Sequence, residues 1–245
     1  MLFKRVIYYA LIIGVLTGLM VTLTQSIQVI PIIQSAEGFE TQASTAPPLM
    51  AAHNDASHNS HSHDESSWMP KDGIERTFYT FLANSFTAIG FSMLMLSLML
   101  MTTKSKSNTE FSWKNAAAWS GAGYLVFFLA PSFGLPPEIP LANSALLEER
   151  QLWWSLTALS TAIGLAGLAF GRAPWRWAMP VFIILPHLFG APHISGAMFN
   201  DNIIELEQLA QSFIPATAFV NAVLWLILGV SCTWVIKRIY KQEKI

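Results

Sequence analysis

The sequence predicts an all-α protein, a polytopic membrane helical bundle with six transmembrane helices. Of its 245 residues, 53% are apolar and only 12% are charged, about half the charged fraction of soluble domains. Apolar runs that approach the ~20 residues needed to cross a bilayer recur along the chain. Transmembrane spans are expected at about 6–30, 78–101, 116–134, 153–171, 176–190 and 214–236.

The first predicted span, within residues 1–30, follows Lys4 and Arg5 as the apolar core of a signal peptide would. Its apolar run is longer than the usual core of about 7–15 residues, and no clear cleavage site of small residues follows it. We therefore expect an uncleaved first helix. The single cysteine, Cys232, excludes a disulfide within one chain.

The distribution of charge predicts the orientation of the spans. If the chain starts inside, the inward-facing segments hold eleven of the fourteen basic residues, and the outward-facing segments hold thirteen of the fifteen acidic residues. This is the partition that the positive-inside rule requires. Five spans would leave the basic C-terminal tail outside. Six spans with both termini in the cytoplasm therefore fit better.

Residues 31–76 are predicted to form one long periplasmic flexible loop, and residues 77–245 to form a bundle of five further helices. The stretch "TQASTAPPLMAAHNDASHNSHSHDESS" is polar and shows no periodicity, which is typical of disordered segments. It contains His53, His58, His61 and His63. Two interpretations remain open. The imidazoles collect a metal ion and lose it as they protonate below about pH 6.5, or they belong to a solvated linker.

The sequence also contains an internal repeat. "ERTFYTFLANSFTAIG" at 75–90 and "ERQLWWSLTALSTAIG" at 149–164 align without gaps, and a third, weaker copy starts at Glu205. We expect three helical hairpins, formed by spans 1–2, 3–4 and 5–6, with an interface that gathers Glu75 and Glu149 near the outer mouth. Each glutamate either stabilises a helix start through the helix dipole or forms part of a carboxylate ring that concentrates cations.

The stretch "LPHLFGAPH" at the end of the fifth span carries the clearest candidate metal ligands. His187 and His193 lie six residues apart, and Gly190 and Pro192 between them interrupt the helix, so both rings can turn toward a common point. Two imidazoles with a carboxylate suit Co²⁺, Ni²⁺ or Zn²⁺. Glu138, at the equivalent broken turn after the third span, is the carboxylate that we add. The alternative is that both histidines are interfacial residues hydrogen-bonded to the helix end.

Small and polar residues inside the spans have further candidate roles. Gly14–Gly18 and Gly167–Gly171 are GxxxG pairs suited to close helix packing. Asn84, about two turns into the second span, is either a polar gate on an ion pathway or a helix–helix hydrogen bond.

The sequence gives no sign of an enzyme or of a fixed cofactor. It contains no GxxxxGK[ST] phosphate-binding loop and no HExxH zinc motif, and no Asp, Glu or His lies in the middle of a span. A dication that enters along a negative-inside potential gains about 4.6 kcal/mol per 100 mV. We therefore expect facilitated uptake, with the metal ion as substrate.

Several motifs together resemble one known family. "MLFKR", the outward His-containing loop, "PKDGIERTFYT", "FFLAPSFGLPPEIP", "RQLWW" and "LPHLFGAPH" occur in this order along nearly the whole chain, and they resemble the CbtA-type cobalt transporter subunits. The resemblance implies a bacterial inner-membrane subunit for cobalt uptake that serves cobalamin biosynthesis. It also implies a companion, CbtB, a small single-span subunit that contains histidines.

The sequence thus predicts a membrane subunit for uptake of divalent cobalt. The alternatives are a membrane metal-binding accessory or sensor protein, or an importer of nickel or another divalent metal. The expected partners are the lipid bilayer, the metal ion, the small single-span subunit and a possible second copy of the chain, with no nucleic acid.

Overall fold

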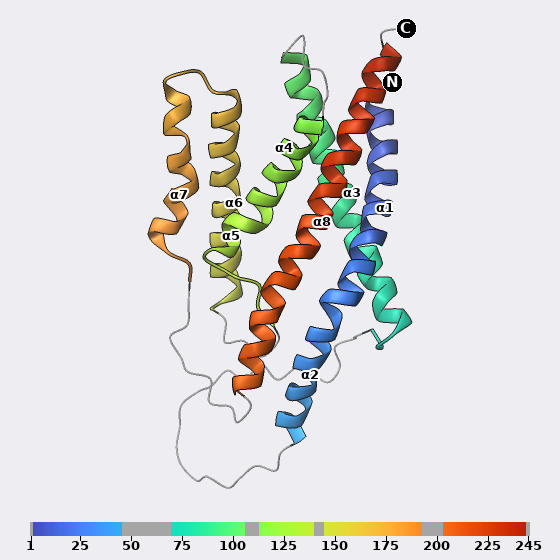
Figure 1. The fold of residues 1–245 in the computed structure, drawn as a ribbon, viewed down its shortest axis with the longest axis vertical. Helices are drawn as coiled ribbons and strands as arrows, with labels where there is room; N and C mark the ends of the chain where they lie inside the picture. The colour runs from blue at the N-terminus through green and yellow to red at the C-terminus, as the bar shows by residue number, and fades with distance from the viewer. Residues whose placement is uncertain (1, 46–69, 106–112, 140–144, 193–202, 244–245) are drawn as a thin grey trace.

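The structure, a computed structural model, describes residues 2–45, 70–105, 113–139, 145–192 and 203–243. Within these residues every regular element is a helix, as predicted, and the helices run roughly along one long axis (Figure 1). In chain order they are α1 (Leu2–Gln28), α2 (Ile30–Thr45), α3 (Ile74–Ser105), α4 (Trp113–Tyr124), the π-helix η1 (Leu125–Leu129), α5 (Ala130–Ser132), α6 (Leu147–Phe170), the 3₁₀-helix η2 (Trp175–Ala178), α7 (Pro180–Phe189) and α8 (Ile203–Glu243).

Four of the described helices are long and apolar enough to cross a membrane. They are Leu2–Gln28, Ile74–Thr102, Leu147–Phe170 and Ile204–Lys241. The third predicted span corresponds to α4, η1 and α5, which follow one another without a gap. The fifth corresponds to α7, whose ten residues extend over about 15 Å, half the thickness of the hydrocarbon core. The membrane character is confirmed, whereas the count of six spans remains a prediction.

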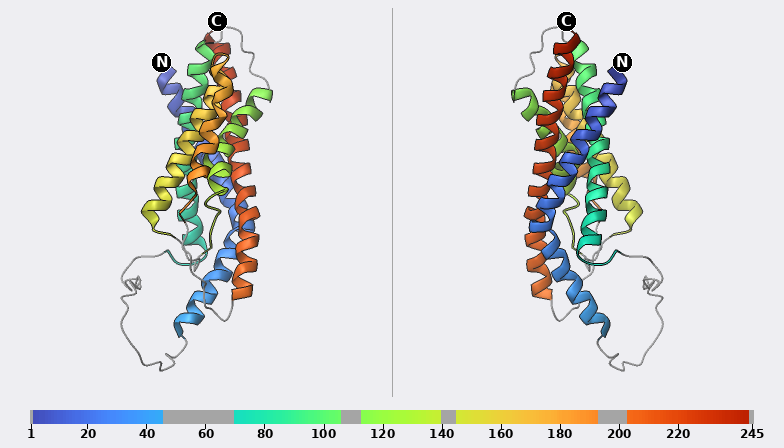
Figure 2. Two further views of the ribbon diagram at one scale, coloured as in Figure 1. Left: turned by 90° about the vertical axis from the view of Figure 1, so that its left-hand side faces the viewer. Right: turned by 90° about the vertical axis from the view of Figure 1, so that its right-hand side faces the viewer.

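The packing of the helices differs from the three predicted hairpins. α1 packs against α3, as expected for the first hairpin, and η1 and α5 pack against α6, as expected for the second. α7, however, packs against α6, and α8 packs against α4, α1 and α3. The views in Figure 2 show the same arrangement from two sides. The predicted pairing of α7 with α8 is therefore wrong, because a bundle of this size offers the apolar face of α8 several other helices to cover it.

The first GxxxG pair lies at a close contact between two helices. A Cβ atom added to Gly14 would lie 2.6 Å from the backbone nitrogen of Ile89, and one added to Gly18 would lie 2.6 Å from Cα of Ser85. Glycine therefore allows α1 and α3 to approach backbone to backbone. The second predicted pair is different, since a Cβ atom added to Gly167 would meet the side chain of Met179 and one added to Gly171 would meet the backbone oxygen of Gly167 and Cβ of Arg176.

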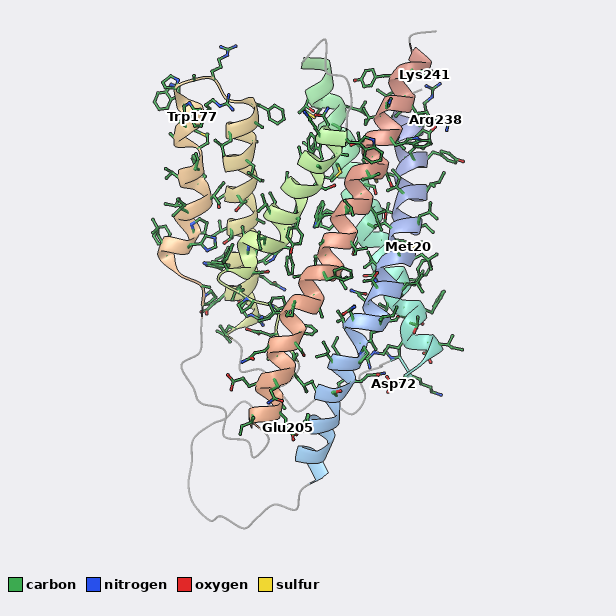
Figure 3. All side chains as sticks on the ribbon, viewed as in Figure 1. Met20, Asp72, Trp177, Glu205, Arg238 and Lys241 are labelled. Atoms are coloured by element: carbon green, nitrogen blue, oxygen red, sulfur yellow. The ribbon has the colours of Figure 1, made fainter. Side chains whose placement is uncertain are left out.

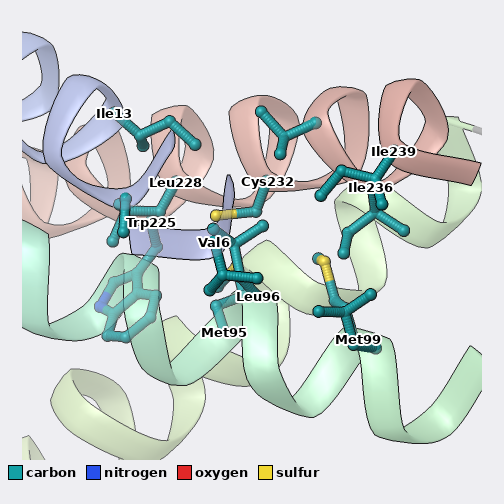
Figure 4. Close-up of a cluster of buried hydrophobic side chains, with 13 residues drawn as sticks. Val6, Ile13, Met95, Leu96, Met99, Trp225, Leu228, Cys232, Ile236 and Ile239 are labelled. Carbon is teal, nitrogen blue, oxygen red and sulfur yellow. The ribbon is translucent and has the colours of Figure 1, made fainter. Parts of the chain in front are cut away.

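The larger hydrophobic cluster lies where α1, α3 and α8 meet, and ten of its residues are labelled in Figure 4. Met95 and Met99 are buried in it beside Cys232. It consists of Val6, Ala10, Ile13, Met95, Leu96, Met99, Leu100, Trp225, Leu228, Cys232, Val235, Ile236 and Ile239.

The predicted flexible loop over 31–76 begins with a helix, which corrects that boundary. α2 covers Ile30–Thr45, and Ala36 in it is fully buried. Leu206 and Phe213 of α8 belong to the same hydrophobic cluster. α8 has 41 residues and extends over about 60 Å, well beyond the ~30 Å hydrocarbon core. Its outer part covers the apolar face of α2, so this segment folds although its composition is largely polar.

Opposite charges gather at opposite ends of the bundle (Figure 3). Asp72 and Glu205 lie at one end, where α3, α6 and α8 begin, whereas Arg238 and Lys241 lie at the other. Both chain termini are also at the basic end. The structure thus has an acidic end and a basic end, and these names are used below.

Candidate functional site

A cavity of about 590 Å³ opens in the half of the bundle nearer the acidic end. It lies between the end of the η1–α5 segment, the chain that follows α5, and the first turns of α6. We call it the outer cavity. Its polar lining is Ser132, Glu138, Arg150, Gln151 and Ser155.

Glu138 does not stand alone in this cavity. Its carboxylate is 2.7 Å from a guanidinium nitrogen of Arg150, and the two side chains are 28% and 27% exposed. Pro136 and Pro137 end the preceding helical segment, and the chain then brings Glu138 over the start of α6. The carboxylate predicted as a metal ligand is therefore held in an ion pair, and a cation that binds it competes with Arg150.

The other Glu-Arg pair of the repeat also uses its arginine in an ion pair. Two guanidinium nitrogens of Arg76 donate to the two carboxylate oxygens of Glu37 at 2.7 and 3.0 Å, and Asp72 accepts at 2.9 Å. This contact fixes α2 to the start of α3. Glu37 and Asp72 were not predicted as partners of Arg76, because Glu37 lies 39 residues away in the predicted loop.

Glu75 and Glu149 both lie in the first turn of their helices, α3 and α6. That position agrees with the helix-dipole interpretation. It also leaves both carboxylates at the acidic end, as the interpretation as a carboxylate ring requires. The two roles are compatible.

His187 lies on α7, half-buried. Its ring is edge-on to Trp153 at 5.6 Å and to Phe133 at 6.4 Å between centroids. His193 falls outside the described residues, as do His53, His58, His61 and His63. Among the residues that the structure describes, no three or more His, Cys, Asp or Glu side chains come together in a possible metal site. The predicted set of His187, His193 and Glu138 therefore stays a prediction.

Asn84 makes the helix–helix hydrogen bonds that were one of its two predicted roles. Its amide nitrogen donates to Thr22 Oγ1 at 3.0 Å and to Gln25 Oε1 at 2.7 Å. Both acceptors belong to α1, and Gly18 packs against α3 one turn before Thr22. The amide therefore joins α1 to α3 at a tightly packed contact.

Aromatic side chains separate the outer cavity from a second cavity nearer the basic end. Phe127 on η1 lines both cavities. Its ring stacks on Trp225 at 5.3 Å, and it also contacts Phe91 at 4.8 Å and Trp154 at 6.3 Å. The second cavity, about 540 Å³, has an almost entirely apolar lining from α3, α4, α6 and α8. The two cavities thus meet at a cluster of four aromatic rings.

Comparison with known proteins identifies the family. The family model described as "Probable cobalt transporter subunit (CbtA)" matches residues 3–237, nearly the whole chain. The chain belongs to the CbtA family. Neither a curated protein nor a solved structure matches it. The CbtA assignment confirms the family resemblance and indicates a transporter subunit with cobalt as its metal.

Proposed function

We propose that this CbtA protein is the membrane subunit through which divalent cobalt is taken up across the bacterial inner membrane. The observation that carries this proposal is the acidic end of the bundle with a cavity that opens beside it. Carboxylates on one end of a low-dielectric bundle raise the local concentration of cations. Of the basic residues described, only Lys71, Arg76 and Arg150 lie at this end, and both arginines are paired with carboxylates.

The orientation follows from the same charges. The positive-inside rule puts the basic end in the cytoplasm and the acidic end in the periplasm. Both termini are then cytoplasmic, which is the arrangement that six crossings produce. In this proposal α4, η1 and α5 form one of the two crossings beyond the four long helices, and α7 covers about half of the other.

Capture of the ion starts at the acidic end. Glu75 and Glu149, with the loop residues His53, His58, His61 and His63, attract the hydrated cation. It then enters the outer cavity, where Glu138 exchanges Arg150 for the metal ion. His187 and His193 complete the ligand set. Arg150 thus keeps the carboxylate neutralised in the absence of metal, because an unpaired charge in a partly buried site is costly.

One observation favours a second candidate function, a metal-binding accessory or sensor protein. The cavity nearer the basic end is apolar, and an ion that crosses it would find few ligands. In that case a partner provides the passage. The small single-span subunit and a second copy of the chain are the candidates, and nickel remains the chemical neighbour of cobalt.

The test is uptake of labelled cobalt into cells that express this chain, alone and with its small partner. We compare Glu138→Gln with Glu207→Gln, because Glu207 is an exposed carboxylate on the acidic end, outside the cavity. If Glu138 is a ligand, its substitution lowers uptake at least tenfold at low cobalt, which is about 1.4 kcal/mol of binding. Glu207→Gln should change uptake less than twofold. Equal effects of the two substitutions would remove Glu138 from the pathway.

A second experiment separates importer from accessory. The purified chain in liposomes should admit cobalt when a negative-inside potential is imposed. If it binds cobalt but passes none until the partner is added, the accessory function is correct.

A further inference from the structure

The apolar cavity nearer the basic end is not used by the proposed uptake. It lies between α3, α4 and α6, with Trp225 of α8 beside it. Small side chains leave the space open, namely Ala118 and Ala122 on α4 and Ala162 and Ala166 on α6. We call it the inner groove. A protein in a bilayer cannot keep such a space empty, because the apolar lining loses its dispersion contacts wherever no atom faces it.

The inner groove has a floor and a mouth. Its floor is formed by Phe91, Phe127 and Trp225, whose rings are in contact at 4.8 to 5.3 Å. Along α3 the lining extends from Phe91 to Thr102, which is roughly 17 Å at about 1.5 Å per residue. This depth matches one leaflet, about half of the ~30 Å hydrocarbon core. A helix that spans both leaflets would be blocked by the floor, whereas an acyl chain of one leaflet fits the depth.

Basic side chains lie beside the mouth of the inner groove. Lys114 precedes the lining residue Asn115 at the start of α4, and Arg172 follows the lining residue Phe170 at the end of α6. Both side chains are exposed. Trp113 is 76% exposed at the same end, as expected for an aromatic residue at the membrane interface. A phosphate at the interface would therefore meet two cationic groups above an apolar channel.

We propose that the inner groove binds one anionic phospholipid of the cytoplasmic leaflet. One acyl chain fills the space between α4 and α6 as far as the Phe91–Phe127–Trp225 floor. The phosphate lies beside Lys114 and Arg172. The lipid joins α6 to α3 and α4 at the basic end.

Quenching of a fluorescent label by brominated lipid tests this proposal. Cys232 is the only native cysteine and is fully buried. It is replaced by alanine, and a bimane label is attached at Ala169→Cys on the edge of the groove. The matched control label is at Val181→Cys on α7, which is exposed and does not line the groove. The full chain is placed in vesicles that contain rising fractions of brominated phosphatidylglycerol or brominated phosphatidylethanolamine.

The label at residue 169 should be half-quenched at a fraction of phosphatidylglycerol that is lower than that of phosphatidylethanolamine by at least about fivefold. Each interfacial cation favours an anionic lipid by about that factor. The label at residue 181 should show no preference. Lys114→Gln with Arg172→Gln should remove the preference. Lys237→Gln with Lys241→Gln, the same change of charge elsewhere at the basic end, should keep it. No preference at residue 169, or an equal preference at both labels, overturns the proposal.

Two further measurements identify the occupant. Ala166→Trp fills the groove, and native mass spectrometry should then count one bound phosphatidylglycerol fewer than for Ile163→Trp, which lies on the same helix outside the groove. An unchanged count refutes the lipid site. An efficient disulfide cross-link between two copies that carry Ala166→Cys, formed in native membranes, would show that a second chain fills the groove and would also refute it. These readouts do not depend on cobalt uptake, so the lipid proposal can fail or succeed independently of the proposed function.

Discussion

Gly18→Ala should destabilise the bundle although alanine is the better helix former. The new Cβ would lie 2.6 Å from Cα of Ser85, whereas carbon atoms in contact are about 3.5–4.0 Å apart. Because the obstacle is backbone, no side-chain rotation relieves it, and α1 must move away from α3 by about 1 Å. Overpacking of this kind costs up to about 3 kcal/mol. The better helix propensity of alanine returns about 1 kcal/mol, which leaves a net loss of about 2 kcal/mol.

Gly90→Ala is the matched control. Gly90 lies in the interior of α3, and a Cβ atom there meets nothing within 4 Å. Only the propensity term remains, so this variant should gain up to about 1 kcal/mol. The two substitutions are chemically identical and should change stability in opposite directions.

The assay uses Cys232, which is 0% exposed, as a reporter of unfolding. The purified protein is heated in detergent with a thiol-reactive dye, and the dye reacts when the cluster opens. At about 2–4 °C per kcal/mol, the midpoint should fall by roughly 4–8 °C for Gly18→Ala and rise by roughly 2–4 °C for Gly90→Ala. A midpoint for Gly18→Ala at or above that of the wild type would refute the close approach of α1 and α3.

Two other contacts lead to predictions of the same kind. Asn84→Leu removes both hydrogen bonds to α1 and should lower the stability by about 0.6–1.7 kcal/mol in the same dye assay. Cobalt uptake per folded molecule should stay unchanged. Unchanged stability with lost uptake would instead make Asn84 a pathway residue. Arg76→Gln releases Glu37, so hydrogen exchange of Ile30–Thr45 should become faster than in the wild type while that of α6 stays unchanged. The expected increase is up to about fivefold, for a partly exposed pair worth about 1 kcal/mol. Equal exchange of Ile30–Thr45 in Arg76→Gln and in the wild type would show that the ion pair does not hold α2.

The long helices were predictable because their signal lies in consecutive residues. α1, α3, α6 and α8 each correspond to a predicted span, and the family resemblance drawn from the quoted motifs is confirmed. α2 was not predicted as a helix, because its polar composition suggests a loop and part of the cover of its apolar face comes from α8, more than 150 positions later in the chain. The predicted hairpin of α7 with α8 was also wrong, since α7 packs on α6.

The candidate site shows the same division. The sequence marked Glu138 and the Glu149–Arg150 pair separately, but it did not predict that Arg150 binds Glu138. Likewise it identified Asn84 as polar in an apolar span, and the choice between its two roles came only with Thr22 and Gln25, about 60 residues away.

The sequence by itself determined that this is a helical membrane protein with an acidic and a basic end, and to which family it belongs. These properties follow from hydropathy, charge and motif order, which add up residue by residue along the chain. The tertiary structure alone decided which helices pack together, where the cavities lie, and which carboxylates are already paired. Such contacts depend on the distance between side chains that are far apart in sequence, and that distance is set by how closely helices can approach, as Gly14 and Gly18 show for α1 and α3.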